Sequence, residues 1–151
     1  MANRNSSVLG CVAAIAVLLG QVAWAADPIG TVKTLGGAAT ITREGAAIPA
    51  TLGMSVFQAD TIATAAGGRI GITFVDNSTM SLGPNASLSL DTFRFDSTTY
   101  EGQFQTTLKQ GTLAAVSGRI AKQTPEAMTV RTPSAILGVR GTKFVVQAGG
   151  G

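Results

Sequence analysis

The feature that most constrains this sequence is the recurrence of apolar residues at every second position within short segments. The clearest example is the segment 69–75, in which Ile70, Ile72 and Phe74 share one face of an extended chain. Successive side chains of a β-strand point to opposite faces, so this alternation predicts a half-buried strand. Gly, Asn, Asp and Ser interrupt the segments, and these residues are typical of turns. The pattern therefore predicts an all-β protein.

We expect strands over 29–35, 39–43, 48–52, 55–58, 60–64, 69–75, 79–82, 86–90, 104–108, 112–116, 128–132 and 142–147, with Phe93 and Phe95 continuing the edge of 86–90. A turn is expected at Gly111, and the segment 117–125 is expected to be irregular. About a dozen short strands with turns every 8–12 residues are typical of a sandwich, a barrel or a solenoid. The periodicity alone does not choose between them.

The N-terminal segment has a different composition. Arg4 supplies a positive start, residues 8–19 form an uncharged apolar run, and small residues occupy positions 23 and 25. This combination predicts a secretory signal peptide over residues 1–25. The apolar run is too short for a membrane span, which needs about 20 residues. We therefore expect a periplasmic or secreted protein with no stable membrane span after cleavage.

The domain that remains after cleavage, residues 26–151, contains no cysteine, histidine or tryptophan. Without histidine or thiol it lacks the usual general base and the usual nucleophile–base pairs, and no set of zinc ligands is present. Removal of Arg4 leaves ten of the 11 Lys and Arg residues against eight acidic residues, so nucleic-acid binding has little electrostatic support. We expect a non-enzymatic protein with no catalytic residues, no cofactor and no metal.

Two other groups of side chains allow a functional interpretation beside a structural one. Asp76-Asn77 and the stretch 91–96 carry oxygen ligands, but they lack the regular spacing of a calcium loop, so turn formation is the favoured interpretation. The aromatic residues near the polar loop 96–102 either pack in the core, which we favour, or form an exposed strip that binds a protein or a sugar. These residues are Phe93, Phe95, Tyr100 and Phe104.

The segment 132–144 is the most unusual part of the chain. Gly138 and Gly141 bracket Val139-Arg140, and glycine is needed where the backbone takes a positive φ or passes close to another chain. This arrangement predicts an extended entry, a tight crossing and a final strand.

Arg140 lies in the middle of this apolar segment and has two interpretations. It either presents its guanidinium to a partner carboxylate or an anionic glycan, or lies partly buried and pairs with a carboxylate. We favour the second, with Asp60 as the first candidate and Asp76 as the second. Removing one partner of a buried ion pair costs about 3–5 kcal/mol, so Arg140→Ala is expected to unfold or strongly destabilise the domain.

Four segments carry a resemblance to a known family, and together they run in order from about residue 30 to 147. The first combines Gly30-Thr-Val with Thr40-Ile-Thr-Arg43, and the others are 53–64, 69–82 and 132–144, of which the last is the most specific. In these segments the chain resembles the FecR domain. The resemblance implies an envelope-side β domain of solenoid-like architecture, with a sandwich as the alternative, that works through protein contacts. Its motif residues here, which we interpret as structural, are Asp60, Thr64, Gly138, Arg140, Gly141 and Thr142.

The sequence departs from the FecR regulators in three places. Ala59 stands where the family usually has glycine, a predicted cleavable signal stands in place of the cytoplasmic anti-sigma segment and spanning helix, and we expect no further domain after the motif. The sigma-factor relay is therefore not expected to transfer. The leading expectation is a non-enzymatic envelope module that binds or scaffolds an unidentified protein, with open strand edges as one route to binding. The alternative is a carbohydrate- or peptidoglycan-binding module, and the oligomeric state is left open.

Overall fold

The computed structural model describes residues 26–139 and 142–149, and it is built almost entirely of β-strands. One layer, layer A, contains β1 (Gly30–Gly36), β4 (Ser55–Val56), β6 (Arg69–Phe74), β7 (Thr79–Leu82), β12 (Lys143–Ala148) and the second half of β9 (Gly102–Val116). The other, layer B, contains β2 (Ala39–Arg43), β3 (Ala46–Pro49), β5 (Thr61–Thr64), β8 (Ser87–Phe95), the first half of β9, β10 (Met128–Arg131) and β11 (Ile136–Gly138). The all-β prediction is confirmed.

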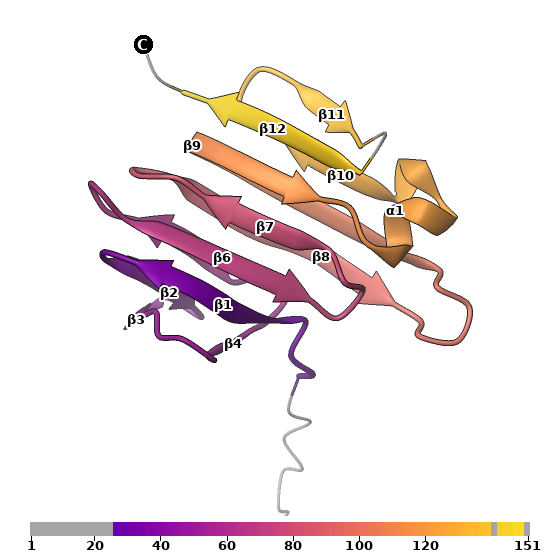
Figure 1. Cartoon of the computed structure of the whole chain (residues 1–151), viewed down its shortest axis with the longest axis horizontal. Helices are drawn as coiled ribbons and strands as arrows, with labels where there is room; N and C mark the ends of the chain where they lie inside the picture. Colours follow the sequence, from indigo (N-terminus) through magenta and orange to yellow (C-terminus); the bar gives the residue numbers. More distant parts are fainter. Residues whose placement is uncertain (1–25, 140–141, 150–151) are drawn as a thin grey trace, which may run out of the picture.

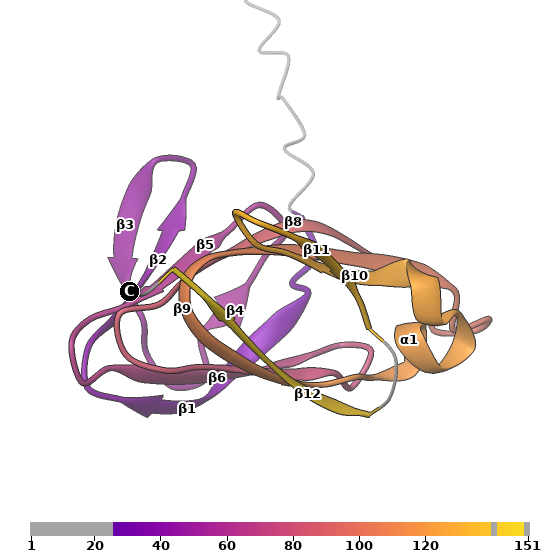
Figure 2. The same cartoon turned by 90° about the horizontal axis from the view of Figure 1, so that it is seen from above.

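The two layers are parts of one curled sheet, and Figure 2 shows them enclosing the core between them. The strand order is β3-β2-β5-β8-β9-β7-β6-β1-β4, with β10, β11 and β12 attached beyond β9. Every pairing among the described strands is antiparallel except that of β9 with β10. This antiparallel pairing does not confirm the solenoid-like architecture that the family resemblance implied.

β9 joins the layers because it belongs to both. Its residues up to Gln110 pair with β8, whereas residues from Gly111 onward pair with β7 and β12 (Figure 1). The inward residues are even-numbered before this point, as at Leu108, and odd-numbered after it, as at Leu113. The prediction of two strands around a turn at Gly111 was wrong. The break in alternation comes from a bulge in one continuous strand, where the register shifts between Ser87 and Leu88 of β8.

The predicted boundaries differ from the structure in further places, among them the strand expected over 48–52, where β3 instead spans Ala46–Pro49. The segment 117–125 was expected to be irregular, but it contains the short helix α1 (Arg119–Gln123), and a 3-10 turn, η1 (Pro125–Ala127), follows. The strand expected over 86–90, with Phe93 and Phe95 continuing its edge, is the single strand β8, whose register with β9 shifts between Leu90 and Thr92. Figures 1 and 2 show α1 at one end of the two layers.

The core lies between the layers and is centred on three phenylalanines. Phe74 comes from layer A, and Phe93 and Phe104 come from layer B. The ring centroid of Phe104 lies 4.8 Å from that of Phe74 and 4.9 Å from that of Phe93, both in edge-to-face geometry. Such pairs contribute about 0.5–1.5 kcal/mol beyond the burial of their area, so this cluster ties the two layers together.

Candidate functional site

The Asp60 carboxylate is buried and fully engaged by its neighbours. Its side chain is 1% exposed, and it forms an ion pair with Arg43 of β2, whose side chain is 29% exposed. Arg43 donates from Nε to Oδ1 at 2.9 Å and from Nη2 to Oδ2 at 2.7 Å, while the Phe57 amide donates to Oδ2 at 2.9 Å. The hydrogen bond with Asp60 raises the pKa of Arg43 above its ordinary value, so the guanidinium remains charged.

The turn that presents Asp60 is anchored to β8. The Ala59 amide donates to the Leu90 carbonyl at 2.7 Å, and the Phe93 amide donates to Gln58 Oε1 at 2.9 Å. Ala59 has φ = 72°, in the left-handed region that favours glycine. Glycine adopts this conformation without strain, so glycine would suit this position better than alanine.

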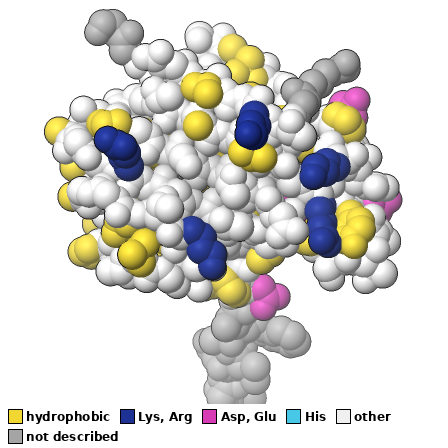
Figure 3. Space-filling view, in the orientation of Figure 1, with side chains coloured by type: hydrophobic (Ala, Val, Ile, Leu, Met, Phe, Trp, Pro, Cys, Tyr) yellow, Lys and Arg dark blue, Asp and Glu magenta, His cyan; other side chains and the backbone are white. Residues whose placement is uncertain are grey.

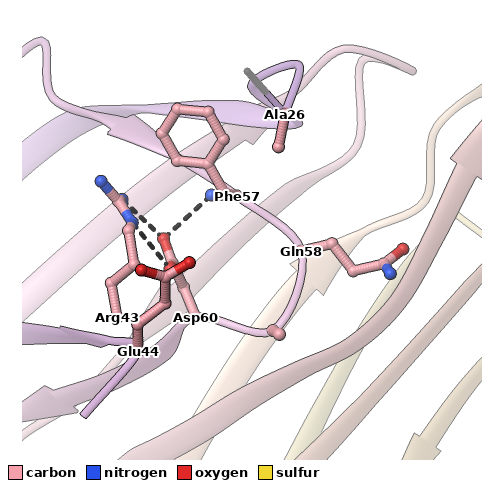
Figure 4. Close-up of a pocket in the computed structure, with 7 residues that line it drawn as sticks. Ala26, Arg43, Glu44, Phe57, Gln58 and Asp60 are labelled. Carbon is pink, nitrogen blue, oxygen red and sulfur yellow. Dashed lines mark hydrogen bonds and ion pairs between the residues drawn. The ribbon is translucent and has the colours of Figure 1, made fainter. Parts of the chain in front are cut away.

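A cavity of about 360 Å³ lies beside this turn, and Figure 4 shows its lining. The Arg43 guanidinium carbon lies 4.4 Å from the centroid of the Phe57 ring, and Arg43 Nη2 also donates to the Ser55 carbonyl at 3.1 Å. Both oxygens of Asp60 accept hydrogen bonds that hold the turn. The arrangement supports a structural role for Asp60, because both oxygens are held by neighbouring donors and the side chain is 1% exposed.

Thr64 is also engaged within the fold. Its Oγ1 donates to the Gly83 carbonyl at 2.6 Å and accepts the Ala86 amide at 2.9 Å. These bonds connect the end of β5 to the turn between β7 and β8. Thr64 and Asp60 thus lie at the two ends of β5, where each fixes a neighbouring turn.

Of the remaining motif residues, Gly138 ends β11, which is separated from β5 by β8, β9 and β10. Arg140 and Gly141 lie outside the described residues, so the predicted partners of Arg140 and the expected effect of Arg140→Ala stay predictions. The Thr142 carbonyl accepts the Ser117 amide at 2.9 Å. Gly138 is exposed, its φ is not in the left-handed region, and a Cβ added there would meet no atom within 4 Å. Glycine is therefore not required at Gly138, whereas the rest of the predicted crossing, at Arg140 and Gly141, lies outside the described residues and stays a prediction.

The acidic residues that suggested calcium ligands are used in turns. Asp76 is 1% exposed, and its Oδ1 accepts both the amide and the hydroxyl of Ser78. Its main-chain carbonyl accepts the Arg119 amide at 2.8 Å, which connects the β6–β7 turn to α1. Within the ranges 26–139 and 142–149, no group of three or more His, Cys, Asp or Glu residues could hold a metal ion.

Asp96 organises the exposed loop between β8 and β9. Its Oδ1 accepts the amides of Thr98 at 2.7 Å and Thr99 at 3.1 Å, and these bonds lower the pKa of Asp96 below 3.8. A carboxylate with a lowered pKa in the folded state stabilises the fold above its unfolded pKa, and this contribution is lost as the pH falls through the folded value. Acidification therefore releases the two amides.

We expect the amide chemical shifts of Thr98 and Thr99, followed by NMR during an acid titration, to change with a common midpoint below pH 3.8. The Asp96→Asn variant is the control and should show no such inflection at either amide. A midpoint at or above 3.8 would contradict the hydrogen-bonded turn.

The aromatic residues near this loop divide into two groups. Phe93 and Phe104 are 7% and 1% exposed and belong to the core, so the favoured interpretation is confirmed for them. Tyr100 is 40% exposed, and its ring stacks on that of the partly buried Phe95 with centroids 6.3 Å apart. The exposed strip is thus reduced to Tyr100 and the edge of Phe95.

The C-terminal end of the sheet presents two open strand edges. In the described residues, β12 pairs only with β9, and β11 pairs only with β10. Ile136, Leu137 and Val145 are 65%, 39% and 70% exposed. A cavity of about 200 Å³ lies between the strands, lined by Leu137, Gly138, Val139, Phe144, Val145 and Val146.

The sequence predicted open strand edges in general, but it did not predict which residues form this surface. The signal for it is present in 143–148, where Val145 is apolar but alternates out of phase with the inward residues Phe144 and Val146. An apolar side chain at an outward position of an edge strand is typical of a contact surface. The two open edges are the candidate binding site.

The fold and this site define a β module with no catalytic constellation among its described residues and an open apolar end. A family model described as FecR protein matches residues 60–151, more than half of the chain. The chain therefore belongs to the FecR family. Searches of curated proteins and of solved structures gave no match.

Membership supports the sequence resemblance and the regulatory, envelope-related nature of the module. FecR proteins are non-enzymatic regulators that work through protein interactions. The matched range begins at Asp60, so it includes both β5 and the C-terminal motif, whereas the resemblance over 30–59 lies outside it. None of the helices described is both long and apolar enough to cross a membrane.

Proposed function

We propose that this chain is an exported, non-enzymatic FecR-domain protein of the cell envelope that binds a protein partner through the edge of β12. In this proposal residues 1–25 are a signal peptide and residues 26–151 form the working domain, in the periplasm or outside the cell. Family membership supports a regulatory module that acts by protein contacts. The predicted signal peptide lies outside the described residues.

The observation that carries the proposal is the unpaired edge of β12. A strand with one neighbour leaves alternate N–H and C=O groups without a strand partner, and an extended peptide binds by completing the ladder. β12 has six residues and β11 has three, so β12 provides the longer template. β12 has no proline and no inward-pointing charge, and its one charged residue, Lys143, lies at its first position, so the rest of the edge carries none of these protective features.

The apolar cavity beside β12 supplies the specificity that main-chain bonds lack. Leu137 and Phe144 line it, and Val145 is exposed next to it. Alternate side chains of an added strand would enter this cavity, while its main chain pairs with β12. The partner segment that fits is therefore extended and apolar at every second position.

A photo-crosslinking amino acid in place of Val145 tests this function in cells. We expect it to capture a defined envelope protein, whereas the same probe at Leu52 should not. Leu52 is a matched control because it is also an apolar residue, 64% exposed, and lies in the loop between β3 and β4.

A charged substitution at the same position completes the test. Val145→Lys places a charge on the edge and should lower copurification of the captured protein by about tenfold, while Leu52→Lys should leave it unchanged. The same protein captured at both positions, or an equal loss in both lysine variants, would rule out the β12 edge as the binding surface.

A further inference from the structure

The outer face of layer A carries basic side chains and no acidic ones on its strands. Lys33 of β1, Arg69 of β6 and Lys143 of β12 are exposed, and no Asp or Glu occurs in β1, β4, β6, β7, β12 or the second half of β9. Figure 3 shows Lys and Arg side chains spread over this face, with Asp and Glu only at its margins. A surface with one sign of charge attracts a partner of the opposite sign.

Between the basic residues the face is lined by small and hydroxyl side chains. Cross-strand register places Gly71 beside Thr34 and Ser81, and then Ala114 beside Ser81 and Val145. A second row runs from Thr31 through Thr73 and Thr79 to Val116 and Lys143. Hydroxyl groups both donate and accept hydrogen bonds, so these rows suit a polar ligand that lies flat on the sheet.

A cavity of about 360 Å³ beside α1 adds two more cations, and it is lined by Tyr100, Arg119, Lys122 and Gln123. The Arg119 guanidinium carbon lies 4.7 Å from the centroid of the Tyr100 ring, which holds the planar group in place. Arg119 and Lys122 have no carboxylate partner, since the one ion pair among the described residues joins Arg43 to Asp60.

The loop holds Tyr100 in an uncommon conformation that positions it for Arg119. Tyr100 has φ = 61°, which is rare for an aromatic residue. Its amide donates to the Asp96 carbonyl at 2.8 Å, and the Asp96 amide donates to the Glu101 carbonyl at 2.9 Å. Strained backbone of this kind persists only where the surroundings impose it, and it is frequent at binding sites.

We propose that the Tyr100–Arg119–Lys122 cavity and the adjoining outer face of layer A bind a carboxylate-bearing polysaccharide. An arginine with free N–H groups in a fixed plane matches a carboxylate, and Lys122 supplies a second charge three residues along α1. Lys33, Arg69 and Lys143 are spread over the face, which fits carboxylates repeated along a polymer better than a single small anion. This site uses the outward side chains of layer A, including Lys143 of β12, whereas the proposed protein partner pairs with the main chain of β12 at its edge.

Two other classes of polyanion fit the surface less well. An extended acidic peptide relies on main-chain hydrogen bonds, but β6, β7 and the second half of β9 already have a neighbour on both sides. A lipid bilayer is bound by surfaces with large apolar side chains, whereas the rows described above consist mainly of Thr, Ser, Gly and Ala. The face therefore offers side-chain hydrogen bonds and charge, which is what an acidic glycan requires.

Titration of the purified protein with polygalacturonate, monitored by calorimetry, tests this site. Neutral dextran, polyglutamate and phosphatidylglycerol vesicles serve as comparison ligands. We expect binding to polygalacturonate that weakens as salt is raised, and weaker or no binding to the other three. No binding to polygalacturonate, or binding to polyglutamate or to the vesicles that is as tight, would overturn the proposal.

Paired charge variants locate the site. Arg119→Gln with Lys122→Gln is expected to weaken polygalacturonate binding by about tenfold, because two exposed ion pairs are lost. Lys109→Gln with Arg131→Gln removes the same charge from exposed positions of layer B and should change binding less than about twofold. All four residues are exposed, so both variants should keep the thermal stability of the parent. An equal loss in the two variants would show that net charge alone is responsible and would refute the assigned site.

Discussion

The Arg43→Ala variant is expected to lose about 3 kcal/mol of unfolding free energy, measured from its midpoint in urea. The reason is the position of its partner, since Asp60 is 1% exposed and would keep only the Phe57 amide as a hydrogen-bond donor. A buried carboxylate that loses its counter-ion retains its desolvation penalty without the compensating attraction. The loss falls toward the lower end of the usual range because Arg43 itself is 29% exposed.

Two further variants separate the ion pair from other effects of the substitution. Arg131→Ala removes an exposed arginine from the same layer and should change stability by no more than about 0.5 kcal/mol. The double variant Arg43→Ala with Asp60→Ala should be more stable than the sum of the single losses predicts, because it leaves no unpaired buried charge. Stability of Arg43→Ala equal to that of Arg131→Ala would show that the pair contributes nothing.

The strands were predictable because alternation and turn residues are local signals. The segments 39–43 and 79–82 coincide with β2 and β7, and Ile70, Ile72 and Phe74 are inward as expected. The continuity of β9 was not predictable, because a bulge and a turn interrupt alternation in the same way. The helix α1 was missed because its five residues depend on a tertiary contact, the bond from the Arg119 amide to the Asp76 carbonyl.

The ion pair of Asp60 was also not predictable from local sequence patterns. Arg140 was expected to pair with a carboxylate, with Asp60 as the first candidate and Asp76 as the second, but Arg140 lies outside the described residues. Among the described residues Asp60 pairs with a different arginine. The observed partner is Arg43, because the register of β2 with β5 pairs Thr42 with Thr61 and so brings Arg43 beside Asp60. Long-range register is not encoded in any local pattern, so composition and spacing cannot choose among the arginines of the chain.

Gly111 is the residue on which the curled shape of the sheet depends most. It has φ = 89°, in the region that favours glycine, and it lies where β9 leaves layer B and enters layer A. An added Cβ would lie 2.4 Å from the Cβ and 2.5 Å from the Cα of Ala86. Ala86 is 1% exposed and its amide is bound to Thr64, so it has little freedom to move.

Gly111→Ala is therefore expected to destabilise the protein by about 2–5 kcal/mol, the sum of the left-handed conformation and the overpacking against Ala86. Gly138→Ala is the matched control, since a Cβ there meets nothing within 4 Å, and its change should stay within about 0.5 kcal/mol. Thermal and urea unfolding of both variants would measure the difference, and a small loss at Gly111 would mean that β9 bends elsewhere.

Gly138 belongs to the family motif although the fold does not require glycine there. If Gly138→Ala remains folded but loses the crosslink formed at position 145, that part of the motif serves binding at the β12 edge.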